Sequence, residues 1–89
     1  MEPTLSILDS IDLTETEKIV VRRFRESPQS RSFLPVSDIL RSHNFRDESI
    51  ELLMAGVQEH PGFTVARVIL VRDLFDKGMV LEALEYLDS

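Results

Sequence analysis

Asn44 and Gly78 lie 34 residues apart, and each separates two segments that have the apolar spacing of a helix. Both residue types tolerate the left-handed backbone conformation with which helices often end. When residues 30–63 are laid over residues 64–89, further positions match in kind: Val36 with Leu70, Leu40 with Leu74, Glu48 with Glu82, Ser49 with Ala83, Ile50 with Leu84 and Leu53 with Leu87. A period of this length predicts stacked copies of one helical unit, in contrast to an enzyme built around one central site.

The apolar spacing and the residues that interrupt it predict five helices. They cover about Glu15 to Glu26, about Ser32 to His43, about Asp47 to His60, about Thr64 to Lys77, and a last stretch that begins near Val80. Thr14 and Glu17 have the spacing of a capping box, in which two side chains at a helix start satisfy free backbone N–H groups. We expect Asp47 to cap the third helix and Ser30 or Ser32 to cap the second.

Gly56 lies inside the predicted third helix, where glycine costs about 1 kcal/mol relative to alanine. We interpret this glycine as a place where another helix crosses too closely to leave room for a side chain. Pro61 and Gly62 then end the helix, because proline cannot continue the hydrogen-bond ladder.

The composition indicates one small folded domain and excludes several kinds of chemistry. The chain has 89 residues, of which 43% are apolar, so it can form one modest core. No apolar run approaches the roughly 20 residues of a membrane span, and the acidic start lacks the positive charge of a secretory signal. The absence of cysteine excludes disulfides and thiolate chemistry and fits a cytoplasmic location.

No motif predicts catalysis, a metal site or a cofactor. The sequence contains no HExxH, P-loop, GxSxG or dinucleotide-binding motif, and its acids do not form a calcium loop. Its two histidines, His43 and His60, fall in the last turns of predicted helices, where a cation interacts favourably with the helix dipole. A net charge of −6 also argues against nucleic-acid binding, which needs clustered cations.

The repeat resembles the tetratricopeptide repeat, a helix–turn–helix unit of about 34 residues closed by a proline. Pro61 takes the closing position, and Asn44 and Gly78 take the turn between the paired helices. Other positions match the small and bulky residues of the family: Ser49, Gly56, Ala66, Ala83, Tyr86 and Leu87. Arg67 and Val71 depart from the pattern, since the family has an aromatic and a small residue there.

The resemblance implies an all-α fold, a right-handed superhelical stack of antiparallel helix hairpins with about five helices. We divide the chain into an acidic leader (1–12), an N-terminal cap helix (13–29), a first repeat (30–63) and a truncated second repeat (64–89). The last helix has no polar capping helix after it, so we expect either that it pairs with another copy of the chain or that the chain is a piece of a longer protein.

The resemblance also implies a function, because the first helix of each repeat in this family lines a concave groove that holds a peptide or helix. Counting from the matched positions assigns the groove to Arg31, Leu34, Asp38, Arg41 and Ser42 in the first repeat and to Val65, Val68, Arg72, Phe75 and Asp76 in the second. Such a groove suits an amphipathic helix or short extended segment with an acidic flank.

Family members that grip a C-terminal carboxylate use lysine and asparagine on this surface. Those positions hold Leu34 and Asp38 in the first repeat and Val68 and Arg72 in the second. An aspartate there repels a carboxylate, so we do not expect binding of this kind.

The sequence therefore predicts a protein-interaction adaptor that has no catalytic activity and no membrane or nucleic-acid partner. Two alternatives stay open. One is a self-assembly module whose only partner is another copy of the chain. The other is a small helical nucleic-acid-binding domain that uses the basic segment Lys18–Arg31, although the net negative charge speaks against it.

Overall fold

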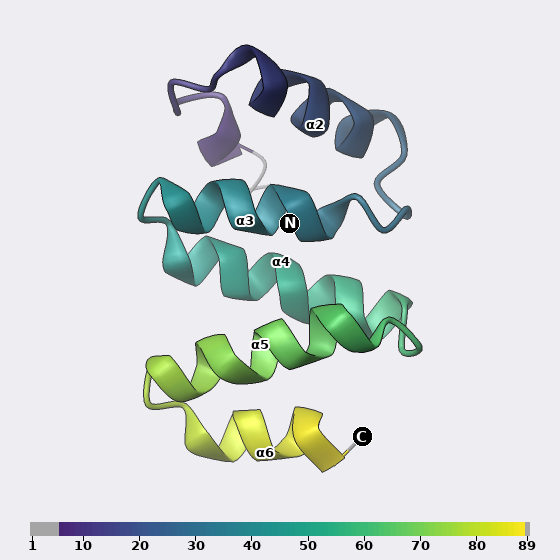
Figure 1. Ribbon diagram of the computed structural model, residues 1–89, viewed down its shortest axis with the longest axis vertical. Helices are drawn as coiled ribbons and strands as arrows, with labels where there is room; N and C mark the ends of the chain where they lie inside the picture. Colours follow the sequence, from purple (N-terminus) through teal and green to yellow (C-terminus); the bar gives the residue numbers. More distant parts are fainter. Residues whose placement is uncertain (1–5, 89) are drawn as a thin grey trace.

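A computed structural model describes residues 6–88, and within that range the chain is all-helical with no strand (Figure 1). Its helices are α2 (Glu15–Glu26), α3 (Phe33–Ser42), α4 (Arg46–Glu59), α5 (Thr64–Asp76) and α6 (Val80–Asp88). Residues 6–8 add a short helical turn before α2. The five predicted helices are confirmed, and each predicted boundary lies within one residue of the observed one.

The capping box at the start of α2 is present as predicted. Thr14 N–H donates to Glu17 Oε1 at 3.0 Å, and Glu17 N–H donates to Thr14 Oγ1 at 3.1 Å. Two backbone N–H groups that have no partner inside the helix are thereby satisfied by one pair of side chains.

The cap predicted for α3 is confirmed in position but not as a side-chain hydrogen bond, and the cap predicted for α4 is wrong. Ser32 occupies the N-cap position of α3 without a side-chain hydrogen bond, and the Ser30 hydroxyl accepts instead from Ser32 N–H at 3.2 Å. Helix α4 begins at Arg46 because the preceding turn places Phe45 at its N-cap. Asp47 therefore lies inside the first turn, where its negative charge still suits the positive end of the helix dipole.

The two turns that define the 34-residue period have the same backbone geometry. Asn44 and Gly78 both have positive φ, at 71° and 81°. The next residue after each donates its N–H to a carbonyl five positions earlier, Phe45 to Leu40 at 2.8 Å and Met79 to Leu74 at 2.9 Å. This bond is the mark of a Schellman ending, so the predicted left-handed exits are confirmed.

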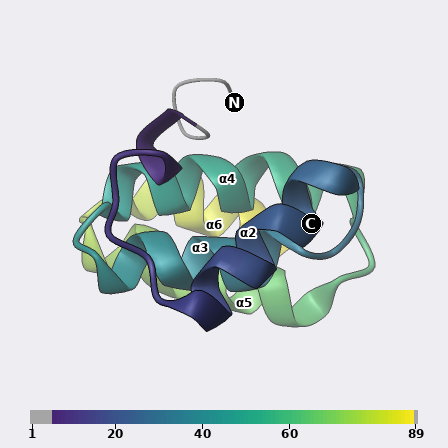
Figure 2. The ribbon, with the colours of Figure 1, turned by 90° about the horizontal axis from the view of Figure 1, so that it is seen from above.

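The helices of the two hairpins lie in two layers. Seen from above, α3 and α5 lie on one side of the molecule and α4 and α6 on the other (Figure 2). Each helix packs against the next one in the chain, from α2 through α6. The largest fully buried apolar side chains lie in this stack: Phe24, Phe33, Val36, Leu40, Leu52, Leu53, Leu70 and Leu74.

Gly56 confirms the predicted close crossing and identifies its partner. A Cβ atom at this position would overlap the ring of Phe33 on α3. The Phe33 ring stacks on His60, with centroids 5.8 Å apart and an interplanar angle of 13°, and meets the edge of Phe63 at 5.8 Å and 81°. Glycine therefore lets α4 approach α3 while this aromatic group fills the space between them.

The N-terminal segment packs against the helices that follow it. Leu8 is buried in the core, and Asp9 Oδ1 lies 2.8 Å from Arg25 Nη2 on α2. The first five residues of the predicted leader lie outside the described residues. Within residues 6–88, no helix is long and apolar enough to cross a membrane.

Candidate partner-binding face

The residues predicted to line a groove on α5 form one exposed stripe along that helix. Val65, Val68, Arg72 and Phe75 recur at intervals of three or four residues, Asp76 follows Phe75, and all five are exposed. Val65 is 58% exposed, Val68 is 61% exposed and Phe75 is 44% exposed. Because the buried residues of α5 lie at other helical positions, the stripe contributes little to the core and is open to a partner.

The residues predicted on α3 are less open. Leu34 is half-buried and packs against the core. Arg41 is also half-buried, and its Nη1 lies 3.0 Å from Oδ1 of the exposed Asp38. Ser42 is exposed, but its hydroxyl donates to the Ile39 carbonyl at 2.9 Å. Helix α3 thus contributes mainly charged side chains that are held in place by ion pairs.

Two contacts align α3 with α5 in the same direction. Before α3 begins, Arg31 Cζ lies 4.6 Å from the centroid of the Phe63 ring, which precedes α5. Near the other ends of the two helices, Arg41 Nη2 lies 3.2 Å from Asp73 Oδ2. The two helices therefore run parallel, as the ribbon shows (Figure 1).

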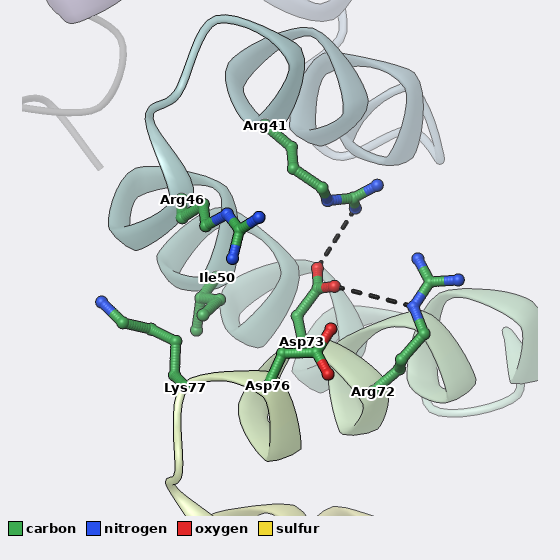
Figure 3. A pocket seen from close by; sticks show the side chains of 7 residues that line it. All are labelled: Arg41, Arg46, Ile50, Arg72, Asp73, Asp76 and Lys77. Atoms are coloured by element: carbon green, nitrogen blue, oxygen red, sulfur yellow. Dashed lines mark ion pairs between the residues drawn. The ribbon is translucent and has the colours of Figure 1, made fainter.

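A pocket of about 130 Å³ opens where the ends of α3 and α5 meet the start of α4 (Figure 3). It is lined by four bases, two acids and one isoleucine: Arg41, Arg46, Arg72, Lys77, Asp73, Asp76 and Ile50. Three of the predicted groove residues, Arg41, Arg72 and Asp76, are brought together here. The other predicted residues lie outside the pocket.

Arg41 and Asp73 form an ion pair with little exposure to water. The Asp73 side chain is 11% exposed, and its Oδ1 also lies 3.8 Å from Arg72 Nε. Although Arg41 Nη2 and Asp73 Oδ2 are 3.2 Å apart, the N–H is not aimed at the oxygen. Arg41 Nε, Arg41 Nη2 and Asp73 Oδ2 are therefore buried without a hydrogen bond within the described part of the chain. Each of these two charges partly compensates the other, together with Asp38 beside Arg41 and Arg72 beside Asp73.

Arg46 is the free cation of the pocket. Its side chain has no ion-pair or hydrogen-bond partner among residues 6–88, whereas Lys77 Nζ is paired with Asp47 Oδ1. Figure 3 shows the Arg46 side chain directed from the start of α4 toward Arg41 and Asp73. Arg46 is exposed, and a guanidinium group with unused donors beside an open pocket is a suitable ligand for a planar anion.

Sequence reasoning missed four residues of this pocket: Arg46, Ile50, Asp73 and Lys77. A usable signal was present, because Arg46 directly precedes one predicted helix and Lys77 ends the next. Adjacent helices joined by a short turn run antiparallel, so the first turn of one meets the last turn of the other. Charges at these two positions are therefore expected to meet.

The histidines do not line the pocket. They occupy the C-cap positions of α3 and α4, one residue beyond the helices. His43 Nε2 lies 3.4 Å from Glu17 Oε1, and His60 Nε2 lies 2.8 Å from the Gln29 carbonyl oxygen. The pKa of Glu17 is lowered, chiefly because Thr14 N–H donates to its carboxylate and further because His43 adjoins it. Within residues 6–88, no group of three or more histidine and carboxylate side chains has an arrangement suited to a metal ion.

The basic segment is divided among several local contacts. Lys18 Nζ lies 3.3 Å from Glu15 Oε1 on the same helix, and Arg25 is paired with Asp9. Arg31 lies over the Phe63 ring, beyond the end of α2.

A second exposed apolar group lies on α6. Val80 is 46% exposed, Leu81 75%, Leu84 42% and Leu87 59%. The exposed charged residues of this helix are the acids Glu85 and Asp88. This surface is separate from the α5 stripe and has the opposite charge from the pocket.

Comparison of the chain with protein-family models, curated proteins and solved structures gave no match in any of the three. The geometry of the helices and of the pocket is therefore the basis for a functional interpretation.

Proposed function

We propose that this chain is a non-catalytic protein-interaction module of the tetratricopeptide-repeat type, which holds a segment of a partner protein along α3 and α5. The 34-residue period, the two matching turns and the two layers of helices support this proposal. In a right-handed stack of such hairpins, α3 and α5 are the first helices of their repeats and line the concave side.

The exposed stripe on α5 is the observation that carries the proposal. Val68 and Phe75 project into solvent from the middle and end of a well-packed helix. Covering them with a partner removes apolar surface from water, which contributes about 25 cal/mol for each Å² buried. The two residues are separated by two helical turns, about 10 Å, which a short peptide or one face of a helix can span.

The charges beside the stripe favour a segment with an acidic flank. Arg72 interrupts the stripe, and the pocket with Arg41 and Arg46 lies at the end of the same face. Complementary charges next to an apolar contact orient a partner and exclude segments with a basic flank. The partner proposed here is thus a segment that has apolar residues two turns apart and acidic residues at one end.

Selection of a random peptide library against the purified chain tests this function. We expect enrichment of peptides with apolar residues and at least one acidic residue. The affinity of a selected peptide, measured by isothermal titration calorimetry, should fall about tenfold or more in Phe75→Ala, since truncating a central aromatic contact costs more than 1 kcal/mol.

Ile19→Ala is the matched control, because it removes a 48% exposed apolar side chain from α2, away from the face. Its affinity for the selected peptide should equal that of the unchanged chain. A library without enriched peptides, or equal losses in Phe75→Ala and Ile19→Ala, would reject the α3–α5 face as the binding surface.

Self-association is a second candidate function, and the exposed leucines of α6 favour it. Leu81, Leu84 and Leu87 form an apolar surface that a second copy could cover. Sedimentation should then show a mass that rises with concentration, and Leu81→Lys should keep the chain monomeric. A constant monomer mass over the whole concentration range contradicts this candidate.

A further inference from the structure

We propose that the pocket between α3, α4 and α5 binds the side-chain carboxylate of a glutamate or aspartate in the partner segment. The inference rests on the proposed function, because it assigns one side chain of the segment that lies on the α5 stripe. It extends that function to residues of α4 and of the α5–α6 turn, Arg46 and Lys77, which lie outside the groove positions of the repeat.

The pocket is positive although the chain as a whole is negative. Its lining has four cationic side chains against two carboxylates, whereas the full chain has a net charge of −6. Asp38 and Asp47 lie outside the lining and offset Arg41 and Lys77, so Arg46 and Arg72 are the cations left to attract an anion. A concave site that concentrates cations on an acidic molecule attracts anions locally, while the rest of the surface repels them. An anionic side chain of a partner segment that lies on the α5 stripe is therefore attracted to this pocket.

Free hydrogen-bond donors lie on Arg46, on Arg72 and on Arg41, whose Nε and Nη2 have no hydrogen-bond acceptor among the described residues. Arg46 has no partner among the described side chains, and Arg72 Nε lies 3.8 Å from Asp73 Oδ1, beyond hydrogen-bond distance. Arg46 and Arg72 come from different helices and lie on either side of the pocket (Figure 3). A carboxylate placed between them can accept charge-assisted hydrogen bonds from both. Arg41, already paired with Asp38 and Asp73, contributes positive charge.

The two acids of the pocket offset part of the attraction that the arginines exert on any anion, so the size and shape of the group favour a carboxylate over a phosphate. Asp73 and Asp76 repel an incoming anion in proportion to its charge. A phosphorylated side chain carries about −1.5 to −2 charges at neutral pH, compared with one negative charge on a carboxylate. The volume of about 130 Å³ also suits a small planar group, and Ile50 offers an apolar contact for the methylene groups of an acidic side chain.

Titration of the ¹⁵N-labelled chain with single-residue probes tests the pocket without knowledge of the partner. The probes are N-acetylglutamate amide, N-acetylglutamine amide and N-acetylphosphoserine amide. We expect saturable NMR shifts in the millimolar range at Arg46, Arg72 and Lys77 with the glutamate probe. The neutral glutamine probe should bind about tenfold more weakly, the loss expected for one charge-assisted hydrogen bond. The phosphoserine probe should also bind more weakly than the glutamate probe.

Substitutions at side chains that have no hydrogen bond or ion pair among the described residues can change binding without disturbing the fold. Arg46→Gln should weaken the glutamate probe about tenfold. Arg23→Gln makes the same change of charge at an exposed position of α2 and should leave the titration unchanged. Asp76→Asn should strengthen the binding of both anionic probes, and that of the phosphoserine probe more, because it removes the charge of a carboxylate that lines the pocket.

Saturable glutamate binding that is lost in Arg46→Gln and kept in Arg23→Gln supports the pocket. Four outcomes would overturn the proposed carboxylate site. They are equal shifts with the glutamate and glutamine probes, tighter binding of the phosphoserine probe, the absence of saturable shifts, and equal behaviour of the two arginine variants. The titration and the peptide library can fail separately. If the selected peptides show no preference for acidic residues, the carboxylate site is rejected and the proposed function stands. If the glutamate probe binds but no peptide is selected, the proposed function is rejected and the anion site of the pocket stands.

Discussion

The first hairpin, α3–α4, and the second, α5–α6, share one turn geometry, but their second helices, α4 and α6, bury very different amounts of their matched apolar residues. Leu53 is fully buried, whereas Leu87, its counterpart 34 residues later, is 59% exposed. Ile50 and Leu84 differ in the same direction, at 6% and 42%. Helix α4 packs against both α3 and α5, while the main described neighbour of α6 is α5. A repeated pattern thus determines local structure, and the neighbours determine how much each copy contributes to stability.

The largest predicted effect compares Leu53→Ala with Leu87→Ala. Truncation at the buried position should lower the free energy of unfolding by about 2–5 kcal/mol, because it removes apolar contact and leaves a cavity. The exposed counterpart should change it by no more than about 0.5 kcal/mol. Urea unfolding followed by circular dichroism measures both values. Similar losses would mean that α6 is covered in solution.

A second prediction concerns the crossing that tightens the first hairpin. Gly56→Ala should destabilise the chain by about 1–3 kcal/mol, because the added methyl group must displace the Phe33 ring from a packed site. Gly62→Ala is the control, since nothing lies within 4 Å of its added Cβ. We expect that variant to be neutral or slightly more stable in the same unfolding measurement. Equal stability of the two variants would disprove the tight crossing.

The two turns should respond differently to substitution although their geometry is the same. Gly78→Ala places a Cβ in the left-handed region and should cost about 1–2 kcal/mol. Asn44→Gly should change stability by only a few tenths of a kcal/mol, because both residue types tolerate positive φ. Thermal unfolding of both variants tests this, and a larger loss in Asn44→Gly would show that the Asn44 side chain stabilises the first turn.

A buried hydroxyl distinguishes the first hairpin from the second. Ser49 Oγ donates to the Ser37 carbonyl oxygen at 2.9 Å, while the matched positions of the second hairpin are Ala83 and Val71. Ser49→Ala should lower the free energy of unfolding by about 0.5–1.5 kcal/mol, the usual net contribution of one hydrogen bond. No change in chemical denaturation would mean that the bond adds no net stability.

The smallest expected effect is a dependence on acid at Glu17 of α2, whose carboxylate accepts from Thr14 N–H and adjoins His43 of the first hairpin. The lowered pKa of Glu17 means that its ionised form stabilises the folded state, and His43 of the first hairpin is one of its partners. This contribution is present above the ordinary glutamate pKa of about 4.3 and is lost as pH falls through the lower pKa of the folded state. Glu17→Gln should remove that part of the acid-induced loss of stability in thermal melts, and Glu85→Gln on α6 should leave it in place.

The sequence was sufficient for the local structure of both hairpins. Asn44 and Gly78 predicted the turns because few residues adopt positive φ, and the capping box predicted the start of α2 from two side chains. Asp47 as a cap failed because the Schellman turn carries the chain into α4 one residue earlier than the polar residue suggested. The position of a helix start depended there on backbone hydrogen bonds that a pattern of residue types does not contain.

The candidate site was only partly predictable. Val65, Val68 and Phe75 could be placed on one helix face from their spacing alone, and they are exposed there. The pocket could not, because Arg41, Arg46 and Arg72 belong to three helices that meet only after the hairpins stack. The burial of Asp73 likewise depends on the distance between α3 and α5. That distance is set by the packing of side chains throughout the core.

The close crossing at Gly56 also has a kinetic consequence. The Phe33 ring fills the space that the missing side chain leaves, between His60 and Phe63. A half-rotation of that ring about its symmetry axis requires the surrounding helices to separate briefly, so the rate of ring flipping should follow the transient breathing of the stack. The aromatic NMR line shape of Phe33 would then report the rate at which the first hairpin transiently opens.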